Sequence, residues 1–379
     1  MKDKTEVLRN SNSSTAGIFQ KVEKIKYELA IFTFLTIVFL PTYNKITDDI
    51  YASLLFLDYR AGFGPRLFLG SLLSFFSLSK SSLLVEGLVT TFGIILILFA
   101  SLLSGNLIRN AGEAKEVTIY FVLLFLSLPY TASAFNHRLS FFDRSLIFFT
   151  LLSLVSLQNK KARWLIPPVL LMALLTDHFF IFLYLPVIAI LILHEVYKGS
   201  FSFKIISLAL VGFAVVFVIS AYFLLTSHEL DKLTESLGSL KTFAFYKQWL
   251  AYVLYVSPIF TMFFLIWGRA AKNSDKKFEK FIFSLCLFLP LSGLPVFLFL
   301  SNSFRLKAAL LIGQFFLLFY FLHVKNEALS NSVEKTAIYL KNHKYLSLAL
   351  LAYSAATFFA FKTGYLWDLI LGPLSTRLL

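Results

Sequence analysis

The chain has 379 residues, of which 58% are hydrophobic and only 15% are charged, and its mean hydropathy is +0.76. A soluble domain is about half apolar and about a quarter charged, so this composition excludes an ordinary soluble domain and indicates a polytopic membrane protein. The net charge of +14 has to be weighed against membrane topology before nucleic acid is considered. Cys286 is the only cysteine, which excludes an intramolecular disulfide and a cysteine metal cluster.

The N-terminal segment and the apolar segments define the expected organisation. Residues 1–26 are polar and basic, which argues against a cleaved signal peptide and predicts a cytoplasmic tail, followed by a single transmembrane domain over 27–379. A helix needs about 20 apolar residues to cross a bilayer core, and a bundle tolerates shorter spans. About eleven segments fit, at residues 27–44, 82–104, 117–135, 144–158, 163–177, 179–195, 205–226, 249–268, 281–300, 306–323 and 345–362. The predicted fold is an all-α, polytopic transmembrane helix bundle.

The distribution of basic residues orients this bundle. With the N-terminus inside, most of the 35 Lys and Arg residues fall in the tail and in connections on the cytoplasmic side. These connections lie near residues 105–116, 159–163, 194–204, 269–280 and 324–344. The bias matches the positive-inside rule. Much of the net charge is therefore topological, and we expect no nucleic-acid partner.

The fifth and sixth segments meet at Asp177 and His178. One long helix would leave both residues in mid-membrane and would invert the charge bias of all later segments, so we expect two helices. Pro167 and Pro168 suit the first turn of a helix that starts near Trp164. Ionisable groups close to membrane depth are candidates for function. The structural alternative for Asp177 is a cap on the sixth helix.

The first external connection holds the densest group of charges, DDIYASLLFLDYRAGFGPR at residues 48–66. Two glycines and a proline force a tight, non-helical path there, so Asp58, Arg60 and Arg66 are expected to converge. The alternative for Asp58 is a salt bridge with Arg60. The stretch that follows, RLFLGSLLSFFSLSK, is too short to span a bilayer and is expected to lie as a helix along its interface.

Carboxylates near a membrane surface suit two kinds of chemistry. Asp48, Asp49 and Asp58 could each act as a general base on an acceptor hydroxyl or help to hold a divalent cation. For Asp48 and Asp49, the alternative is capping of an interfacial helix.

Basic side chains on the external side run against the positive-inside trend. Arginine can bind two phosphate oxygens at once, so such a set predicts an anionic substrate, while snorkelling to lipid phosphate is the alternative for each residue. The set comprises Arg60, Arg66, Arg138, Arg144, Arg305 and Lys307.

The short connection FNHRLSFFDR adds further candidates. His137 could bind a metal, a phosphate or a sugar hydroxyl, or it could be a capping or surface residue. If the fourth helix begins near Ser140, Asp143 lies in its first turn and complements the helix dipole. His194 and His323, on the cytoplasmic side, are expected to be ordinary interfacial residues.

This external set of charges resembles that of the GT-C superfamily, the polytopic glycosyltransferases that use polyprenyl-linked sugar donors. The size and the Phe-rich composition are also similar to those of bacterial O-antigen and capsule polymerases. In such proteins an acid of the first external loop serves as base or metal ligand, and the resemblance implies Asp49 or Asp58 for that role. It implies His137 and Asp143 for the charged connection between the third and fourth helices.

The leading hypothesis is a glycosyltransferase, or repeat-unit polymerase, in a bacterial inner membrane, with its active site on the extracytoplasmic face. The catalytic base is expected to be Asp58, with Asp49 or Asp177 as alternatives. The partners are a polyprenyl-linked sugar donor, a glycan or lipid-linked acceptor and membrane lipid, and Mg²⁺ or Mn²⁺ stays open as a cofactor. A transporter or flippase of a lipid-linked glycan or other anion is the alternative. The residues expected to bind substrate or phosphate are Arg60, Arg66, His137, Arg138, Asp143, Arg144, His178, Arg305 and Lys307.

Overall fold

A computed structural model of the chain shows helices and no β-strand in the parts it describes. The described residues are 25–39, 67–75, 82–135, 141–177, 179–199, 207, 210–212, 214–215, 217–218, 222, 243–293, 303–350 and 352–353. The all-α prediction is therefore confirmed for this part of the chain.

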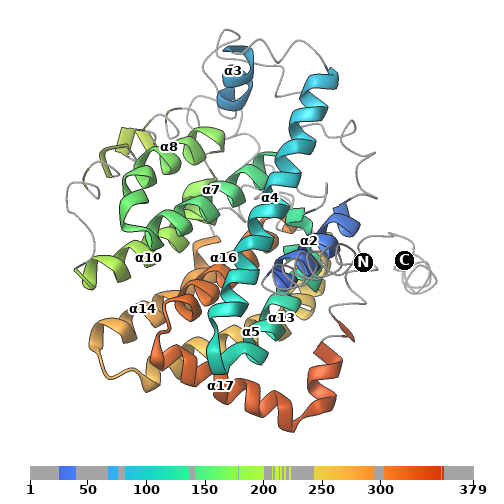
Figure 1. Ribbon diagram of the computed structural model, residues 1–379, viewed down its shortest axis with the longest axis vertical. Helices are drawn as coiled ribbons and strands as arrows, with labels where there is room; N and C mark the ends of the chain where they lie inside the picture. Colours follow the sequence, from blue (N-terminus) through green and yellow to red (C-terminus); the bar gives the residue numbers. More distant parts are fainter. Residues whose placement is uncertain are drawn as a thin grey trace, which may run out of the picture.

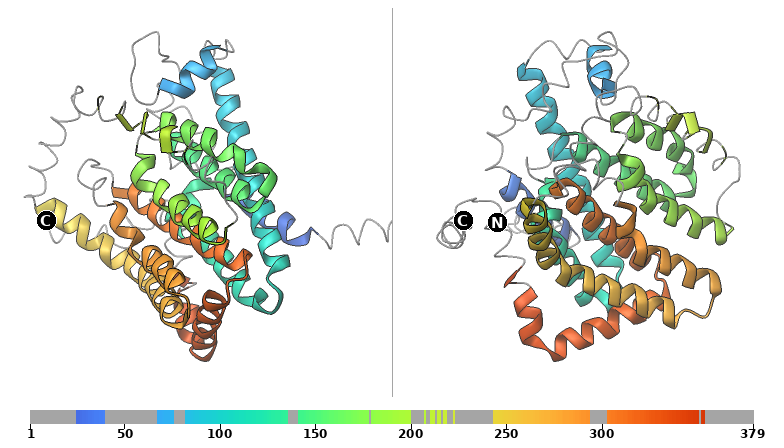
Figure 2. Two further views of the ribbon diagram at one scale, coloured as in Figure 1. Left: turned by 90° about the vertical axis from the view of Figure 1, so that its left-hand side faces the viewer. Right: turned by 180° about the vertical axis from the view of Figure 1, so that it is seen from behind.

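The longer helices form a bundle in which several run in the same general direction, as α4, α13 and α16 do in the left view of Figure 2. They are α2 (Lys26–Phe39), α4 (Ser82–Asn110), α5 (Lys115–Ser127), α7 (Phe141–Gln158), α8 (Ile166–Thr176), α10 (Leu185–Tyr197), α13 (Phe243–Asn273), α14 (Lys277–Phe288), α16 (Ser303–His323) and α17 (Glu327–Asn342). The shorter elements are α3 (Leu67–Phe75), α6 (Pro129–Ala132), α9 (Phe180–Leu183), and the 3-10 turns η4 (Gly112–Ala114), η5 (Ser133–Phe135), η6 (Lys160–Leu165) and η7 (Leu289–Gly293).

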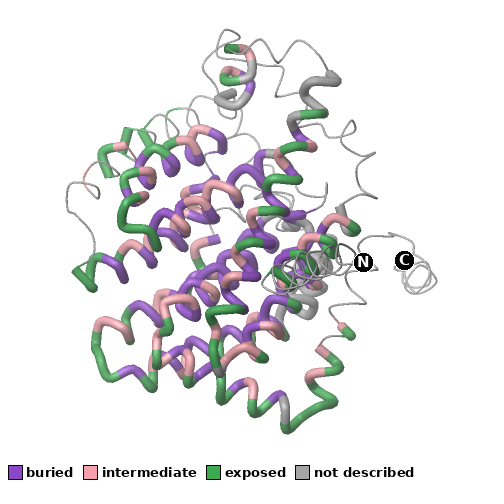
Figure 3. The backbone as a smooth tube through the Cα atoms, in the orientation of Figure 1, coloured by how far each residue is buried: buried purple, intermediate pink, exposed green. Residues whose placement is uncertain are grey.

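Helix α16 is the centre of the bundle (Figure 1), because it contacts α4, α6, α9, α10, α17 and η7. Nearly all of its apolar length is enclosed by other helices, whereas α4 keeps one side exposed (Figure 3). Two helical stretches of the described residues, Val89–Asn110 and Leu306–His323, are long and apolar enough to cross a membrane. Helix α10 is apolar but shorter.

Side-chain contacts show which helix ends lie together. Glu28 at the start of α2 pairs with Arg109 at the end of α4, and Tyr320 near the end of α16 bonds to Glu195 near the end of α10. We call this end, where α4, α7, α10 and α16 finish, the inner end, following the expected topology. The end at which α4, α7 and α16 begin and α8 finishes is the outer end.

The helix boundaries follow local sequence signals. Helix α8 begins with prolines at its first positions, as predicted from Pro167 and Pro168. The Asn326 side chain accepts a hydrogen bond of 3.1 Å from the Leu329 N–H and caps α17. Gly199, with φ of 66°, follows the end of α10 in the left-handed conformation that glycine adopts most readily.

Three expected segments are interrupted in the structure. The segment 117–135 is helical only to Ser127 and then turns into α6 and η5, because Leu128 is extended before a proline. The segment 179–195 is divided at Tyr184, next to the proline at the start of α10. The segment 281–300 leaves the α-helix after Phe288 and enters η7. The eleven-span count also includes residues outside the described ranges.

Candidate functional site

Four of the predicted site residues have described side chains. All four are buried, with exposed fractions of 4% for Asp143, 2% for Arg144, 0% for Asp177 and 8% for Lys307. We call them the outer cluster. For Arg305 the structure describes only the backbone, in the first turn of α16. The remaining candidates, which lie outside the described residues, are Asp49, Asp58, Arg60, Arg66, His137, Arg138 and His178.

Asp143 and Arg144 lie in the first turn of α7, as predicted for Asp143. A carboxylate there faces the positive end of the helix dipole, so the dipole stabilises its charge. A buried arginine cannot become neutral in a protein, and its burial is tolerated only where its charge is compensated. The first turn of α7 therefore places one group of each sign inside the bundle.

Asp177 shapes the turn between α8 and α9. Its φ of −156° and ψ of 120° end α8, which confirms two helices rather than one. The Oδ1 atom of Asp177 accepts a hydrogen bond of 3.0 Å from the Phe179 N–H, and its carbonyl oxygen accepts one of 3.0 Å from the Phe180 N–H. Asp177 is thus held in a fixed orientation by the backbone of the turn. The alternative, a cap on the sixth helix, is wrong: the N-cap residue of α9 is Phe179, no side chain caps that helix, and the Asp177 bond stays within the turn.

The outer cluster comes from the starts of α7 and α16 and from the turn after α8, which lie at the outer end of the bundle. Helices α7 and α8 form an antiparallel pair joined by η6, so the first turn of α7 and the last residue of α8 lie at the same end. Ser292 of η7 donates a hydrogen bond of 3.1 Å to the Phe182 carbonyl of α9, just beyond the Asp177 turn. Gly293 of η7 packs closely against the start of α16, because a Cβ atom on this residue would lie only 2.7 Å from the side chain of Leu306, the residue before Lys307. The start of α16 is therefore linked through η7 to α9.

A second group of buried polar residues lies at the inner end and was not predicted. The Nη2 atom of Arg163 in η6 donates to Oε2 of Glu195 at 2.8 Å, and its Nε donates to the Leu157 carbonyl at 3.0 Å. The Tyr320 hydroxyl donates to Oε1 of Glu195 at 2.5 Å. We call Arg163, Glu195 and Tyr320 the inner network. It joins η6, α10 and α16.

His194 stands beside this network and is 1% exposed, which corrects the prediction of an ordinary interfacial residue. Its ring packs edge-to-face on Phe321, with 4.9 Å between ring centroids. Its Nδ1 atom is 3.7 Å from Oε1 of Glu195, and neither ring nitrogen has a hydrogen-bond partner in the described part of the chain. Helical spacing could have indicated this burial, because Ile190 and Leu191, four and three residues earlier on the same helix face, are apolar and buried.

Metal binding was left open by the sequence. Among the described residues, no three His, Cys, Asp or Glu side chains are grouped so that they could hold a metal ion. Compared with known proteins, the chain matches no family model, and it matches neither a curated protein nor a solved structure.

Proposed function

We propose that the chain is an integral membrane protein. The two long apolar helical stretches support this, and so does the exposed face of α4, where Ile94, Ile95, Leu98 and Leu102 are between 45% and 49% exposed. These four residues recur at positions that share one side of a helix. Water would make such an apolar stripe costly, whereas lipid would not.

We further propose that the protein is a glycosyltransferase that takes sugar from a polyprenyl-linked phosphate or pyrophosphate at the extracytoplasmic face. The supporting observation is the outer cluster, in which two acids and two cations from three helices are buried at one end of the bundle. Burying ionisable groups costs desolvation free energy, so their presence there favours a functional role. Residues Asp58, Arg60 and Arg66 belong to this proposal on the sequence argument alone.

The proposed reaction assigns a part to each charge. A carboxylate, from Asp177, Asp58 or Asp49, takes the proton of the acceptor hydroxyl while that oxygen attacks the anomeric carbon of the donor sugar. The bond from this carbon to the phosphate oxygen breaks, and the lipid phosphate leaves with the electron pair. Arg144 and Lys307 stabilise the negative charge on that leaving group, as positioned cations do in phosphoryl chemistry.

The transporter alternative has one observation in its favour. Helix α16 carries a buried lysine at its outer end and a buried, hydrogen-bonded tyrosine near its inner end. A transporter needs polar groups lining a route through the bundle, and these two residues stand near the two ends of one helix. An assay of sugar transfer separates the two functions, because only a transferase forms a new glycosidic product.

The test is transfer from a polyprenyl-pyrophosphate sugar by the purified, reconstituted chain. Asp177→Asn keeps the hydrogen bond to Phe179, since Asn caps as well as Asp, but removes the carboxylate. If Asp177 is the base, transfer falls about a hundredfold or more while thermal stability is unchanged. Asp275→Asn, an exposed residue after α13, is the matched control and keeps full activity. Absence of any product from the wild type, or full activity in the Asn variants of Asp49, Asp58 and Asp177 alike, would overturn the proposal.

A further inference from the structure

The last turn of α10 and the first turn of α14 lie side by side at the inner end, on the left of Figure 1. A row of three aromatic rings joins them. The Tyr197 ring stacks on the Phe278 ring with 4.2 Å between their centroids, and the centroids of Phe278 and Phe281 are 6.2 Å apart. Tyr197 is 49% exposed and Phe281 is 52% exposed, so both ends of the row face outward.

Each ring of this row has a lysine directly before or after it in the sequence. These lysines are Lys198, Lys277 and Lys280, and all three are exposed. We call the three rings and the three lysines the basic patch. Within the part of the chain that the structure describes, none of these lysines forms an ion pair. Three neighbouring cations without counterions attract an anion to this surface.

The acids beside the patch do not cancel its charge. Glu279 lies in the first turn of α14, but its carboxylate accepts a hydrogen bond of 3.1 Å from the Ser274 hydroxyl and lies 3.6 Å from Nζ of Lys276. The other acid, Asp275, is exposed in the connection before α14. When the patch is counted together with residues 272–280, five lysines face two acids, which leaves a charge of +3.

Beyond the lysines, the outward faces of both helices are apolar. Leu193 and Val196 on α10 and Phe288 on α14 are each more than a third exposed. Helix α14 carries no charged residue after Lys280, and the histidine and the glutamate of α10 are buried. The surface therefore changes from basic to apolar at one level on two helices. Lysines and aromatic rings are placed in this way where lipid head groups meet acyl chains.

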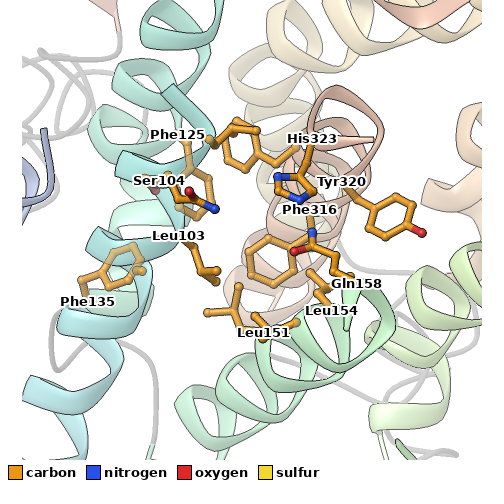
Figure 4. A pocket seen from close by; sticks show the side chains of 15 residues that line it. Leu103, Ser104, Phe125, Phe135, Leu151, Leu154, Gln158, Phe316, Tyr320 and His323 are labelled. Atoms are coloured by element: carbon orange, nitrogen blue, oxygen red, sulfur yellow. The ribbon is translucent and has the colours of Figure 1, made fainter. Parts of the chain in front are cut away.

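The α10 side of the patch is held from within the bundle. In the close view of Figure 4, the Tyr320 hydroxyl points away from the other labelled side chains. It donates to Glu195, which lies two residues before Tyr197, and Arg163 donates to the other oxygen of the same carboxylate. Both oxygens of this acid are therefore engaged inside the bundle. The last turn of α10 is fixed before any ligand binds, which reduces the entropic cost of binding.

We propose that the basic patch binds the head group of an anionic phospholipid of the inner leaflet. The lipid phosphate lies among the three lysines, and the acyl chains lie along the apolar faces of α10 and α14. The charge selects an anionic head group, and the exposed rings and apolar faces select a lipid over a soluble anion. This inference rests on the membrane assignment proposed above and does not depend on sugar transfer.

The test uses the purified full chain in nanodiscs of phosphatidylcholine that contain a small fraction of a photoreactive lipid. The probe is phosphatidylglycerol, or phosphatidylcholine in a second sample, with a diazirine on the acyl chain close to the glycerol. After illumination, mass spectrometry is expected to find about tenfold more cross-links on Tyr197 and Phe281 with the phosphatidylglycerol probe. This preference corresponds to about 1.4 kcal/mol of binding.

Two pairs of substitutions test whether the lysine charge causes the preference. Lys198→Gln with Lys277→Gln is expected to reduce it below about twofold, whereas Lys198→Arg with Lys277→Arg keeps the charge and keeps the preference. The matched control is Lys335→Gln with Lys344→Gln, which removes the same charge from exposed positions on α17 and just beyond it. This control is expected to leave the labelling of Tyr197 unchanged.

The remaining outcomes count against the proposal. Equal labelling by the two probes in the wild type, or an equal loss in the control variant, would overturn it. Labelling of neither ring by either probe would place the patch in water, as the docking face for an acidic protein would be, and would overturn it too. Recovery of the chain in the soluble fraction after carbonate extraction would overturn the membrane assignment itself and this proposal with it, so the two failures are distinguishable.

Discussion

Replacing Arg163 by methionine is expected to cost more stability than any exposed substitution nearby. Arg163 is 6% exposed, and methionine keeps much of its apolar length while removing the guanidinium. The substitution removes the 2.8 Å bond to Glu195 and the 3.0 Å bond to the Leu157 carbonyl at the end of α7. Glu195, itself 6% exposed, then keeps only the Tyr320 hydroxyl as partner within the inner network.

The magnitude follows from removing the cationic member of the buried pair of Arg163 with Glu195. Removing one member of a buried ion pair costs about 3–5 kcal/mol. Glu195→Gln added to Arg163→Met removes the stranded charge while keeping an acceptor for Tyr320, so the double variant is expected to recover about 2 kcal/mol of that loss. This recovery separates the electrostatic effect from a simple loss of packing.

The assay is the free energy of unfolding in mixed detergent micelles, followed by circular dichroism as sodium dodecyl sulfate is added. Lys161→Met is the matched control, because Lys161 is an exposed neighbour in the same turn. Its effect is expected to stay within about 0.5 kcal/mol. If Arg163→Met costs no more than this control, or if the double variant recovers nothing, the reasoning about the inner network is wrong.

Two glycine positions give further predictions, measured in the same unfolding assay. A Cβ on Gly313 would lie 2.9 Å from Val187, so Gly313→Ala is expected to push α16 from α10 and to cost about 1–3 kcal/mol. Gly268→Ala meets nothing within 4 Å and is expected to be neutral or to stabilise its helix by up to about 1 kcal/mol; equal effects at the two positions would contradict this packing. A Cβ on Gly105 would overlap the Glu28 side chain, so Gly105→Ala is expected to break the pair of Glu28 with Arg109 and to cost about 1–3 kcal/mol. In a variant in which Glu28 is already alanine, Gly105→Ala should cost less stability. An unchanged cost would exclude the broken pair of Glu28 with Arg109 as the cause.

The division of the chain at Asp177 was predictable because its cause is local. Two ionisable residues between short apolar segments resist burial in one continuous helix, and two prolines mark the start of the helix that ends there. The first-turn position of Asp143 followed in the same way from where the polar connection ends. Local composition was sufficient in both cases.

The interruptions inside the expected spans were missed although the sequence marks them. Each stands beside a proline, at Pro129, Pro186 and Pro290, which lack a backbone donor and restrict the preceding residue. Pro258 lies inside α13 without ending it. Proline alone therefore does not decide whether a helix ends, since the packing of the next turn also contributes.

The inner network could not be predicted, because its members are far apart in sequence. Glu195 bonds to Arg163 across 32 positions and to Tyr320 across 125. No local pattern distinguishes Arg163 from the lysines beside it, which are exposed. Only the packing of α10 against α16 brings these groups together.

The central claim is that sugar transfer takes place at the outer end of the bundle, and one measurement tests it directly. Lys160→Cys in a Cys286→Ala background gives a single exposed thiol at the inner end, because Cys286 is buried. An impermeant thiol reagent then reports which way the protein faces in proteoliposomes that contain a polyprenyl-pyrophosphate sugar. We expect glycosidic product only from an impermeant acceptor on the side opposite the labelled thiol. Product from an acceptor on the thiol side, or from neither side, would contradict the claim.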